Sequence, residues 1–369
     1  MRIAILGTRG VPANYGGFET CAEQLGARLV QRGHHVTVYC RSHHITHPKN
    51  TYRGMHLIKL PTVPNKYLDT IVHTWLSSLH SLFRKYDIVL YFNVGNSPLT
   101  WIPRLVGSKT ILNVDGLDWK REKWPGWAKR YIQWAEYLAT KLPHIYLTDS
   151  QVVQAYYRER YDHTPPTIAY GSDVDYVPPG ETLARFGLQP QRYILFVGRL
   201  VPENYAHHLV DAFRGLDTDL KCVIVGDAPY VDAYIARLKA KARPDPRIIF
   251  TGYVFGRDYY ELGSNSTIFV ETAGAGGTHP ALLEAMRFGN CVVVNNTLEN
   301  LEALGDTGLS YEGRAGAPAL QRVLQELLSN PLIIKQYGEK ARQRACRMYS
   351  WESITDKYEN LMRALLDTK

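Results

Sequence analysis

The chain has 369 residues, of which 45% are hydrophobic and 21% are charged, as in an ordinary globular protein with room for two domains. Its five cysteines are scattered and never spaced as Cys-x-x-Cys, which argues against a disulfide framework or a zinc site and favours a reducing cytoplasm. No apolar run reaches the roughly 20 residues of a membrane helix, and the opening MRIAILGTRG is typical of a strand and turn rather than a signal peptide.

The net charge of +8 is unevenly distributed along the chain. Residues 1–172 hold 21 Lys and Arg against 11 Asp and Glu, whereas the remainder is slightly acidic. A basic half indicates that one face meets an anionic partner, for which nucleic acid and an anionic membrane surface are both candidates. A basic surface without a specific partner is the plain alternative.

The first half of the chain alternates between strand and helix patterns. Residues 1–7 predict a strand, 8–18 a glycine-rich loop, and 19–33 a helix with Cys21, Leu25 and Leu29 four residues apart, followed by the strand pattern HHVTVYCR. Further strands are expected at 55–60, 87–93, 109–115 and 144–150, and helices at 66–85 and 127–142. This order is typical of a parallel sheet wound with helices, in a domain that ends near residue 172.

After the proline-bearing segment 173–190 the same pattern restarts. Strands are expected at 193–199, 221–227, 247–253, 266–272 and 291–296, helices at 204–214, 230–242 and 280–289, and a helical tail at 331–366. The fold class is therefore α/β, with two doubly wound domains. Ligands of such domains bind where strand ends enter helices, so we expect the loops 8–18, 115–126, 198–205 and 273–280 to form one site in a cleft.

Two glycine-rich turns carry the features of anion sites. In GTRGVPANYGGFE (7–19), Gly16 and Gly17 fall at a helix start, where backbone N–H groups can approach a phosphate. The loop is not Gly-x-Gly-x-x-Gly and no acidic residue ends the second strand, which disfavours a dinucleotide oxidoreductase. In GGTHPALLEAMRFGN (276–290), Pro280 suits the first helical position and leaves unpaired N–H groups around Thr278 to Leu282.

Two side chains beside these turns are candidates for contacting a ligand. Arg199, in FVGRLVPEN, follows a strand end and could meet an anion bidentately, although an ion pair with Glu203 is an alternative. Glu284 lies one helical turn beyond Pro280, where its carboxylate could accept hydrogen bonds from vicinal sugar hydroxyls or could pair locally with the helix.

These motifs together resemble the family-4 glycosyltransferases of the GT-B fold, nearly end to end. The resemblance rests on the Gly-Gly-Phe-Glu loop, the Gly-Arg-Leu strand end, the Leu-Leu-Glu-Ala-Met helix and the tail YSWESITDKYENL. The stretches GTRGVPANYGGFET, NVDGLDWKR and GGTHP are similar to the branch implicated in bacterial rhamnosyl and related surface-polysaccharide transfer. The resemblance implies two Rossmann-like domains, at 1–172 and at 173–349. It also implies that the C-terminal helix of about 350–369 packs back on the first of them.

The resemblance also implies a chemistry: retaining, metal-independent and cofactor-free transfer of a sugar from a nucleotide-diphosphate donor. Arg199 and the amides near Gly16 and Gly17 would hold the diphosphate, and Glu284 the ribose. The expected donor-binding residues are Gly16, Gly17, Arg199, Asn204, Gly276, Gly277, Thr278, His279 and Glu284. The expected catalytic residues are Arg199 and Asp115.

Three positions depart from the family pattern. Gly276 stands where relatives carry a glutamate toward the donor sugar, with Glu271 as an alternative source of that carboxylate; we expect Gly276→Glu to lower activity with the native donor. Asn204 replaces a lysine near the diphosphate. Asp115 replaces a histidine, and it could stabilise positive charge at the anomeric carbon or simply cap a strand end.

The acceptor is expected at the basic first domain. The helical stripe in 66–85 (Leu68, Ile71, Val72, Trp75, Leu76, Leu79 and Phe83) is predicted to face the core. Segment 118–130 is predicted to face a membrane, because Trp119, Lys120, Arg121 and Trp124 mix indoles and cations that are hard to bury. We therefore expect a cytoplasmic protein with peripheral contact to an anionic membrane and a glycan or lipid-diphosphate-linked acceptor.

Other protein classes explain less of the sequence. A nucleic-acid-binding protein would account for the basic half but not for the anion-binding turns, so no nucleic acid is expected. A GT-B epimerase would need acid–base residues around the sugar, and Asp115 alone supports that class weakly. A phosphorylase would need a pyridoxal lysine, and no lysine motif in the sequence marks one.

Overall fold

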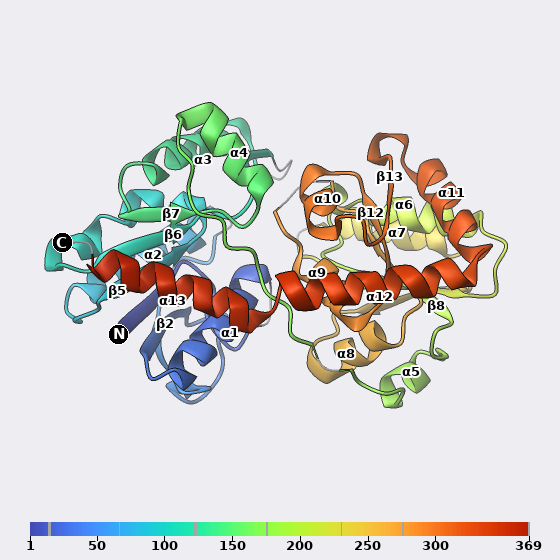
Figure 1. The fold of residues 1–369 in the computed structure, drawn as a ribbon, viewed down its shortest axis with the longest axis horizontal. Helices are drawn as coiled ribbons and strands as arrows, with labels where there is room; N and C mark the ends of the chain where they lie inside the picture. Colours follow the sequence, from blue (N-terminus) through green and yellow to red (C-terminus); the bar gives the residue numbers. More distant parts are fainter. Residues whose placement is uncertain are drawn as a thin grey trace. The chain divides into compact units, whose positions relative to one another are not determined.

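The computed structural model describes residues 1–13, 16–65, 67–120, 124–174, 176–229, 231–274 and 277–367. The chain divides into two compact units (Figure 1). The first comprises Met1–Gly171 and Trp351–Lys369, and the second comprises Ser172–Ser350. Each unit is built on a largely parallel sheet, as the alternating sequence pattern predicts.

The sheet of the first unit has the strand order β3-β4-β2-β1-β5-β6-β7, and only β3 runs antiparallel to its neighbour. Its strands are β1 (Arg2–Leu6), β2 (His35–Arg41), β3 (Thr51–Tyr52), β4 (Met55–Leu60), β5 (Ile88–Phe92), β6 (Lys109–Asn113) and β7 (Ile145–Leu147). Central strand β5 is buried along its whole length, which explains its uninterrupted apolar sequence.

The helices of the first unit cover this sheet. They are α1 (Gly17–Gln31), α2 (Asp69–Ser81), α3 (Gly126–Ala139), α4 (Gln151–Tyr161) and α13 (Trp351–Asp367), with the 3₁₀ turns η1 (Val94–Leu99), η2 (Ile102–Val106) and η3 (Asp118–Lys120). Helix α13 packs against α1, where Arg32 contacts Asp356 at 2.7 Å and Glu359 at 2.9 Å. The expected return of the chain's C-terminal end to the first domain is confirmed.

Helix α2 buries its polar face. Its buried residues are His73, Thr74, Ser77, Ser78 and Ser81, whereas Trp75 is 48% exposed. The Ser77 hydroxyl donates to the His73 carbonyl at 2.8 Å and the Ser78 hydroxyl to the Thr74 carbonyl at 2.7 Å, so these groups are satisfied within the helix. The prediction that the apolar stripe of 66–85 faces the core holds for Ile71 and Leu79, which pack against the core, and is wrong for Leu68, Trp75 and Phe83, which are exposed.

The sheet of the second unit has the order β10-β9-β8-β11-β12-β13. Its strands are β8 (Tyr193–Val197), β9 (Lys221–Val225), β10 (Ile248–Gly252), β11 (Ile268–Glu271), β12 (Cys291–Asn295) and β13 (Leu309–Tyr311). Its helices are α5 (Glu181–Arg185), α6 (Ala206–Arg214), α7 (Asp232–Ala242), α8 (Gly256–Ser264), α9 (Pro280–Phe288), α10 (Leu298–Leu304), α11 (Ala317–Leu328) and α12 (Pro331–Met348), with η4 (Pro202–Asn204) and η5 (Gly313–Ala315).

The helical tail expected at 331–366 consists of two helices. Helix α12 ends at Met348 and α13 begins at Trp351, and the chain passes from the second unit to the first between them. The Tyr349 side chain is buried and its hydroxyl donates to the Ala303 carbonyl at 3.3 Å. Because Ala303 belongs to the second unit, this contact fixes the end of α12 to that unit.

Candidate active site

The first glycine-rich loop leads from β1 to the start of α1. A Cβ at Gly7 would lie 2.3 Å from the Phe92 carbonyl oxygen, and the φ of Gly7 is +91°, so only glycine fits. Gly16 is the N-cap residue and Gly17 the first residue of α1, which has no side-chain cap. Buried Glu19 braces the loop by accepting a hydrogen bond from the Arg9 amide at 2.8 Å. The helix start is thus formed by glycine backbone, as an anion site requires.

Asp115 follows β6 in a left-handed conformation with φ +60°. Its amide donates to Asn113 Oδ1 at 2.9 Å, and the buried Tyr170 hydroxyl donates to Asp115 Oδ1 at 2.8 Å. A non-glycine residue in this region is strained and is held there by its surroundings. Asp115 is therefore a fixed, half-buried carboxylate at the carboxyl edge of the first sheet.

Arg199 follows β8 in the second unit and is half-buried. Within the described part of the chain its guanidinium has no hydrogen bond or ion pair, so the alternative pairing with Glu203 does not occur. The Asn204 side chain donates to the Arg199 carbonyl at 2.9 Å, and the Thr272 hydroxyl donates to the Asn204 carbonyl at 2.5 Å. Asn204 therefore shapes the loop that carries Arg199.

The second glycine-rich loop runs from β11, which pairs directly with β8, to the start of α9. Gly276 lies outside the described residues, while Gly277 and Thr278 are buried. His279 is the N-cap residue of α9 and Pro280 the first helical residue, as predicted, and His279 makes no side-chain cap. The loops of Arg199 and of α9 thus leave adjacent strands at the same edge.

Glu284 is half-buried on α9, and its Oε2 accepts a hydrogen bond from the Tyr259 hydroxyl at 2.6 Å. Burial raises the pKa of Glu284 to about 7. Glu271 is buried and its Oε1 accepts from the Ala273 amide at 3.0 Å, which ties its carboxylate to the turn after β11. Tyr170 and Tyr259, which orient two of the candidate carboxylates, carry no sequence signal, because each lies far along the chain from its partner.

The indole-rich segment 118–130 is less exposed than predicted. Trp119 is half-buried and its ring lies 6.3 Å from that of Tyr156. Trp124 is also half-buried and its Nε1 donates to Asp118 at 3.0 Å. Both pack against the core of the first unit, so the expectation that the indoles of this segment are hard to bury is wrong for these two, whereas Trp127 is 60% exposed as expected. Lys120 is exposed, and Arg121 lies outside the described residues.

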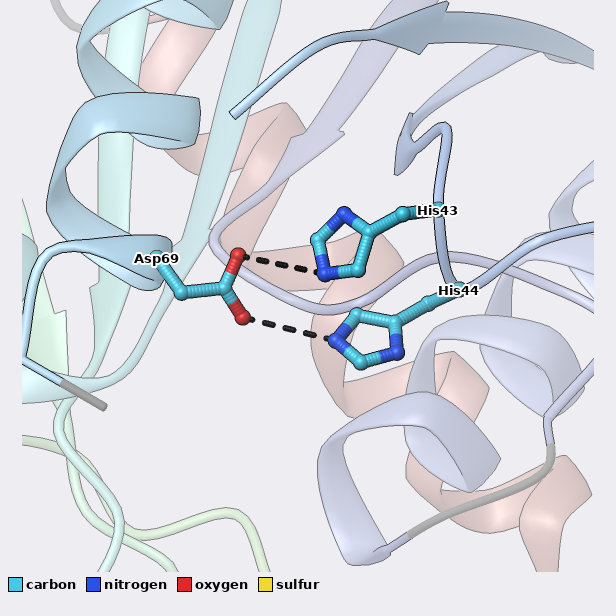
Figure 2. Close-up of side chains that lie close together, drawn as sticks. All are labelled: His43, His44 and Asp69. Carbon is cyan, nitrogen blue, oxygen red and sulfur yellow. Dashed lines mark hydrogen bonds and ion pairs between the residues drawn. The ribbon is translucent and has the colours of Figure 1, made fainter. Parts of the chain in front are cut away.

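One group of described side chains could hold a cation (Figure 2). The imidazoles of His43 and His44 point at Asp69, with Nε2 atoms 3.7 and 3.4 Å from its two oxygens. Burial and the nearby Arg9 lower the pKa of His44, which favours the neutral, ligating form. However, Arg41 contacts the same carboxylate at 2.6 Å, so its charge is already balanced. We interpret this cluster as two imidazoles packed around the Arg41–Asp69 ion pair.

Two family models match successive parts of the chain. The model described as "Glycosyltransferase Family 4" matches residues 15–180, and the model described as "Glycosyl transferases group 1" matches residues 184–344. The chain belongs to the family-4 glycosyltransferases. With its two parallel-sheet units, this glycosyltransferase has the GT-B fold.

Known proteins similar to this glycosyltransferase include enzymes with different substrates. It is 24% identical to the alpha-maltose-1-phosphate synthase of Mycolicibacterium smegmatis, over 98% of its own length and 99% of that protein's. It is 27% identical to the O-antigen chain mannosyltransferase C of Escherichia coli, over 48% of each chain. The crystal structure of Anabaena HepE in complex with UDP-glucose matches with a TM-score of 0.81 at 16% identity, covering 99% of this chain and 100% of that one.

Proposed function

We propose that this glycosyltransferase moves a hexose or deoxyhexose, with retention of configuration and without a metal, from a nucleotide-diphosphate sugar to a glycan or lipid-diphosphate-linked acceptor in surface-polysaccharide synthesis. The observation that carries the donor assignment is Arg199, a half-buried cation without a partner among the described residues, at the edge where α9 begins. The UDP-glucose bound to HepE and the O-antigen activity of the Escherichia coli relative support the same class of donor and product.

The proposed mechanism follows from where charge develops. As the bond between the anomeric carbon and the diphosphate breaks, the leaving group takes the electron pair, and Arg199 and the amides at the α9 start stabilise its charge. The acceptor oxygen forms the new bond to that carbon and passes its proton to the departing diphosphate. Asp115, held by Tyr170, stabilises the positive charge of the oxocarbenium-like state, and Glu284 accepts from the ribose hydroxyls.

The first test is thermal unfolding of the purified protein with UDP, GDP, dTDP and ADP, and then with their sugars. A ligand that binds only the folded state at about a hundredfold excess over Kd stabilises it by about 2.7 kcal/mol. We expect one nucleotide to raise the Tm and Arg199→Ala to abolish the shift. Arg237→Ala, which removes an exposed arginine of α7, should keep it.

In transfer assays we expect Arg199→Ala to slow turnover by about a hundredfold, the typical cost of losing one donor to a developing negative charge. Near-normal activity of this variant would remove Arg199 from the mechanism. If no nucleotide shifts the Tm of folded protein and oligonucleotides bind in a salt-sensitive way, a nucleic-acid-binding role replaces the transferase proposal.

We also propose a cytoplasmic location with peripheral contact to an anionic membrane, where a lipid-linked acceptor would be available. The basic charge of residues 1–172 supports this location. None of the described helices is both long and apolar enough to cross a bilayer.

A further inference from the structure

Large apolar side chains gather on the outside of the first unit. Phe83 is 86% exposed, Leu105 67% and Trp127 60%. We call the following exposed residues the apolar face: Leu68, Trp75, Phe83, Trp101, Leu105, Val106, Trp127, Trp134 and Tyr137. They belong to or flank α2, η2 and α3, and an exposed apolar group of this size marks an interaction surface.

The orientation of α2 explains why its apolar residues are outside. The Ser and Thr face packs inward, where small side chains with internally satisfied hydroxyls are buried. Leu68, Trp75 and Phe83, spaced at about two helical turns, are left on the outer face. The sequence of α2 is that of an ordinary amphipathic helix, but only part of its apolar stripe, including Ile71 and Leu79, packs against the core, and the rest faces outward.

Contacts tie the three elements into one surface. Helix α2 contacts both η1 and η2, and α3 packs against η1. The ring of Tyr67, just before α2, lies 4.9 Å from that of Trp127 in α3. At the other end, Arg104 of η2 donates to the carbonyl of Leu142, just after α3, at 2.5 Å.

The exposed charges around the apolar face are mostly positive, although Asp87, two residues beyond Lys85, is also exposed. Exposed cations lie within or directly after the three elements: Arg84, Lys85, Arg104, Arg130 and Lys141. In the described part of the chain, none of them forms an ion pair with a carboxylate. The acidic residues of α2, η1, η2 and α3 are Asp69 and Glu136, of which Asp69 is paired with Arg41 and Glu136 is buried under two tyrosine hydroxyls.

We propose that the apolar face docks on the surface of an anionic lipid bilayer, with its indoles and Phe83 inserted at the interface and its cations against lipid phosphates. Tryptophan and tyrosine beside lysine and arginine suit this interface. A second copy of the chain fits less well, because a two-fold contact would set the cations of one face against those of the other. The inference rests on the proposed function only for the reason why the enzyme would bind a membrane. Binding of the apolar face to lipid requires neither the sugar donor nor the acceptor.

The test is co-sedimentation of the full chain with vesicles of phosphatidylcholine alone or with about 30% phosphatidylglycerol, at about 0.1 M salt. We expect binding to the anionic vesicles only, weakened by added salt. Arg84→Ala with Lys85→Ala should weaken it roughly thirtyfold, from the usual contribution of two cations at a charged surface. Trp75→Ser with Phe83→Ser should weaken it by at least about tenfold.

The matched control is Leu298→Ser with Leu332→Ser, which removes two exposed apolar side chains of the second unit and should leave vesicle binding unchanged. All variants should keep the Tm and the nucleotide-induced shift of the parent protein, which separates this surface from the donor site. The proposal is overturned if the parent does not bind anionic vesicles, if it binds neutral vesicles equally, or if the α2 variants bind as the parent does. A dimer that Phe83→Ser dissolves would equally overturn it, by assigning the face to a second copy.

Discussion

At Glu284 the ionisation state of one side chain bears on donor binding. Burial raises the pKa of this carboxyl group from 4.5 to about 7, so the unfolded chain releases this proton before the folded one does. As the pH rises from 4.5 to 7, this residue therefore lowers the free energy of unfolding. A ribose that donates hydrogen bonds to Glu284 favours the ionised carboxylate. Donor binding therefore lowers the pKa that burial raises.

We predict that affinity for the nucleotide-sugar donor rises about tenfold between pH 6 and pH 8, as Glu284 passes from mostly protonated to mostly ionised. Glu284→Gln should bind weakly and lose this dependence. Isothermal titration with the intact sugar nucleotide is the measurement, and a 2′,3′-dideoxy donor should show no pH dependence in the parent protein. A pH profile that is unchanged in Glu284→Gln would exclude Glu284 as the ribose ligand.

Several features of the site could be expected from the residues themselves and others could not. Pro280 at the first position of α9 follows from its missing N–H and preset φ. The Tyr259 and Tyr170 hydroxyls could not be expected, because a buried tyrosine has the same sequence signal whether or not it meets a carboxylate. Asn204 was expected near the diphosphate because relatives have a lysine at this position. In the structure its side-chain amide donates to the Arg199 carbonyl.

Among the elements, α13 is held to the first unit by charge as well as by apolar packing. Glu359 meets Arg32 at 2.9 Å and His34 at 3.0 Å. Arg363, Arg32 and His34 together lower the pKa of Glu359 to about 2. This stabilisation is complete above the unfolded value of 4.5 and is lost as the pH falls toward 2.

We predict that Glu359→Gln lowers the free energy of unfolding by about 2 kcal/mol at pH 7, and by progressively less below pH 4.5. Urea unfolding at neutral and acidic pH measures both values. Glu339→Gln, on an exposed face of α12, is the control and should unfold as the parent does. If Glu359→Gln lowers the free energy of unfolding as much at pH 3 as at pH 7, the packing of the Glu359 side chain rather than its charge is responsible.

The central strands were predictable because parallel strands that are buried on both faces have unbroken apolar sequences, as in β5 and β12. Short elements such as β3 and β13 were not, since two or three residues carry no periodicity. The inward face of α2 was predicted only in part, because Ile71 and Leu79 pack against the core as expected but share that face with buried Ser and Thr residues. Hydropathy counts serine and threonine as polar, yet their hydroxyls are satisfied by the helix's own carbonyls when buried.

At the scale of the whole molecule, the α/β class and the GT-B fold were predictable from the repeated strand–helix pattern and the family resemblance. In each sheet the chain first adds strands on one side of its first strand, β1 or β8, and then adds the remaining strands on the other side, which satisfies that pattern with short connections. Exposure of the apolar face was not predictable, because it depends on which side of α2 packs against β1 and β4.

We predict that metal chelation leaves sugar transfer unchanged. The diphosphate charge is expected to meet Arg199 and helix amides, and Asp69 in the His43, His44 cluster is already paired with Arg41 at 2.6 Å. Initial rates with excess EDTA and with added Mg²⁺ should agree. His43→Ala with His44→Ala should match the parent in both conditions, and a rate loss that Mg²⁺ restores would contradict the prediction.

The division of the first unit between the two ends of the chain has a consequence for biosynthesis. The ribosome completes residues 172–350 before it releases Trp351–Asp367, whose Trp351, Ile354, Tyr358 and Met362 are buried in the first unit. The second unit can therefore mature while the first still lacks a helix and exposes the surface of α1. Until residues 351–367 are translated, the first unit is therefore the part of the nascent chain that is more vulnerable to aggregation.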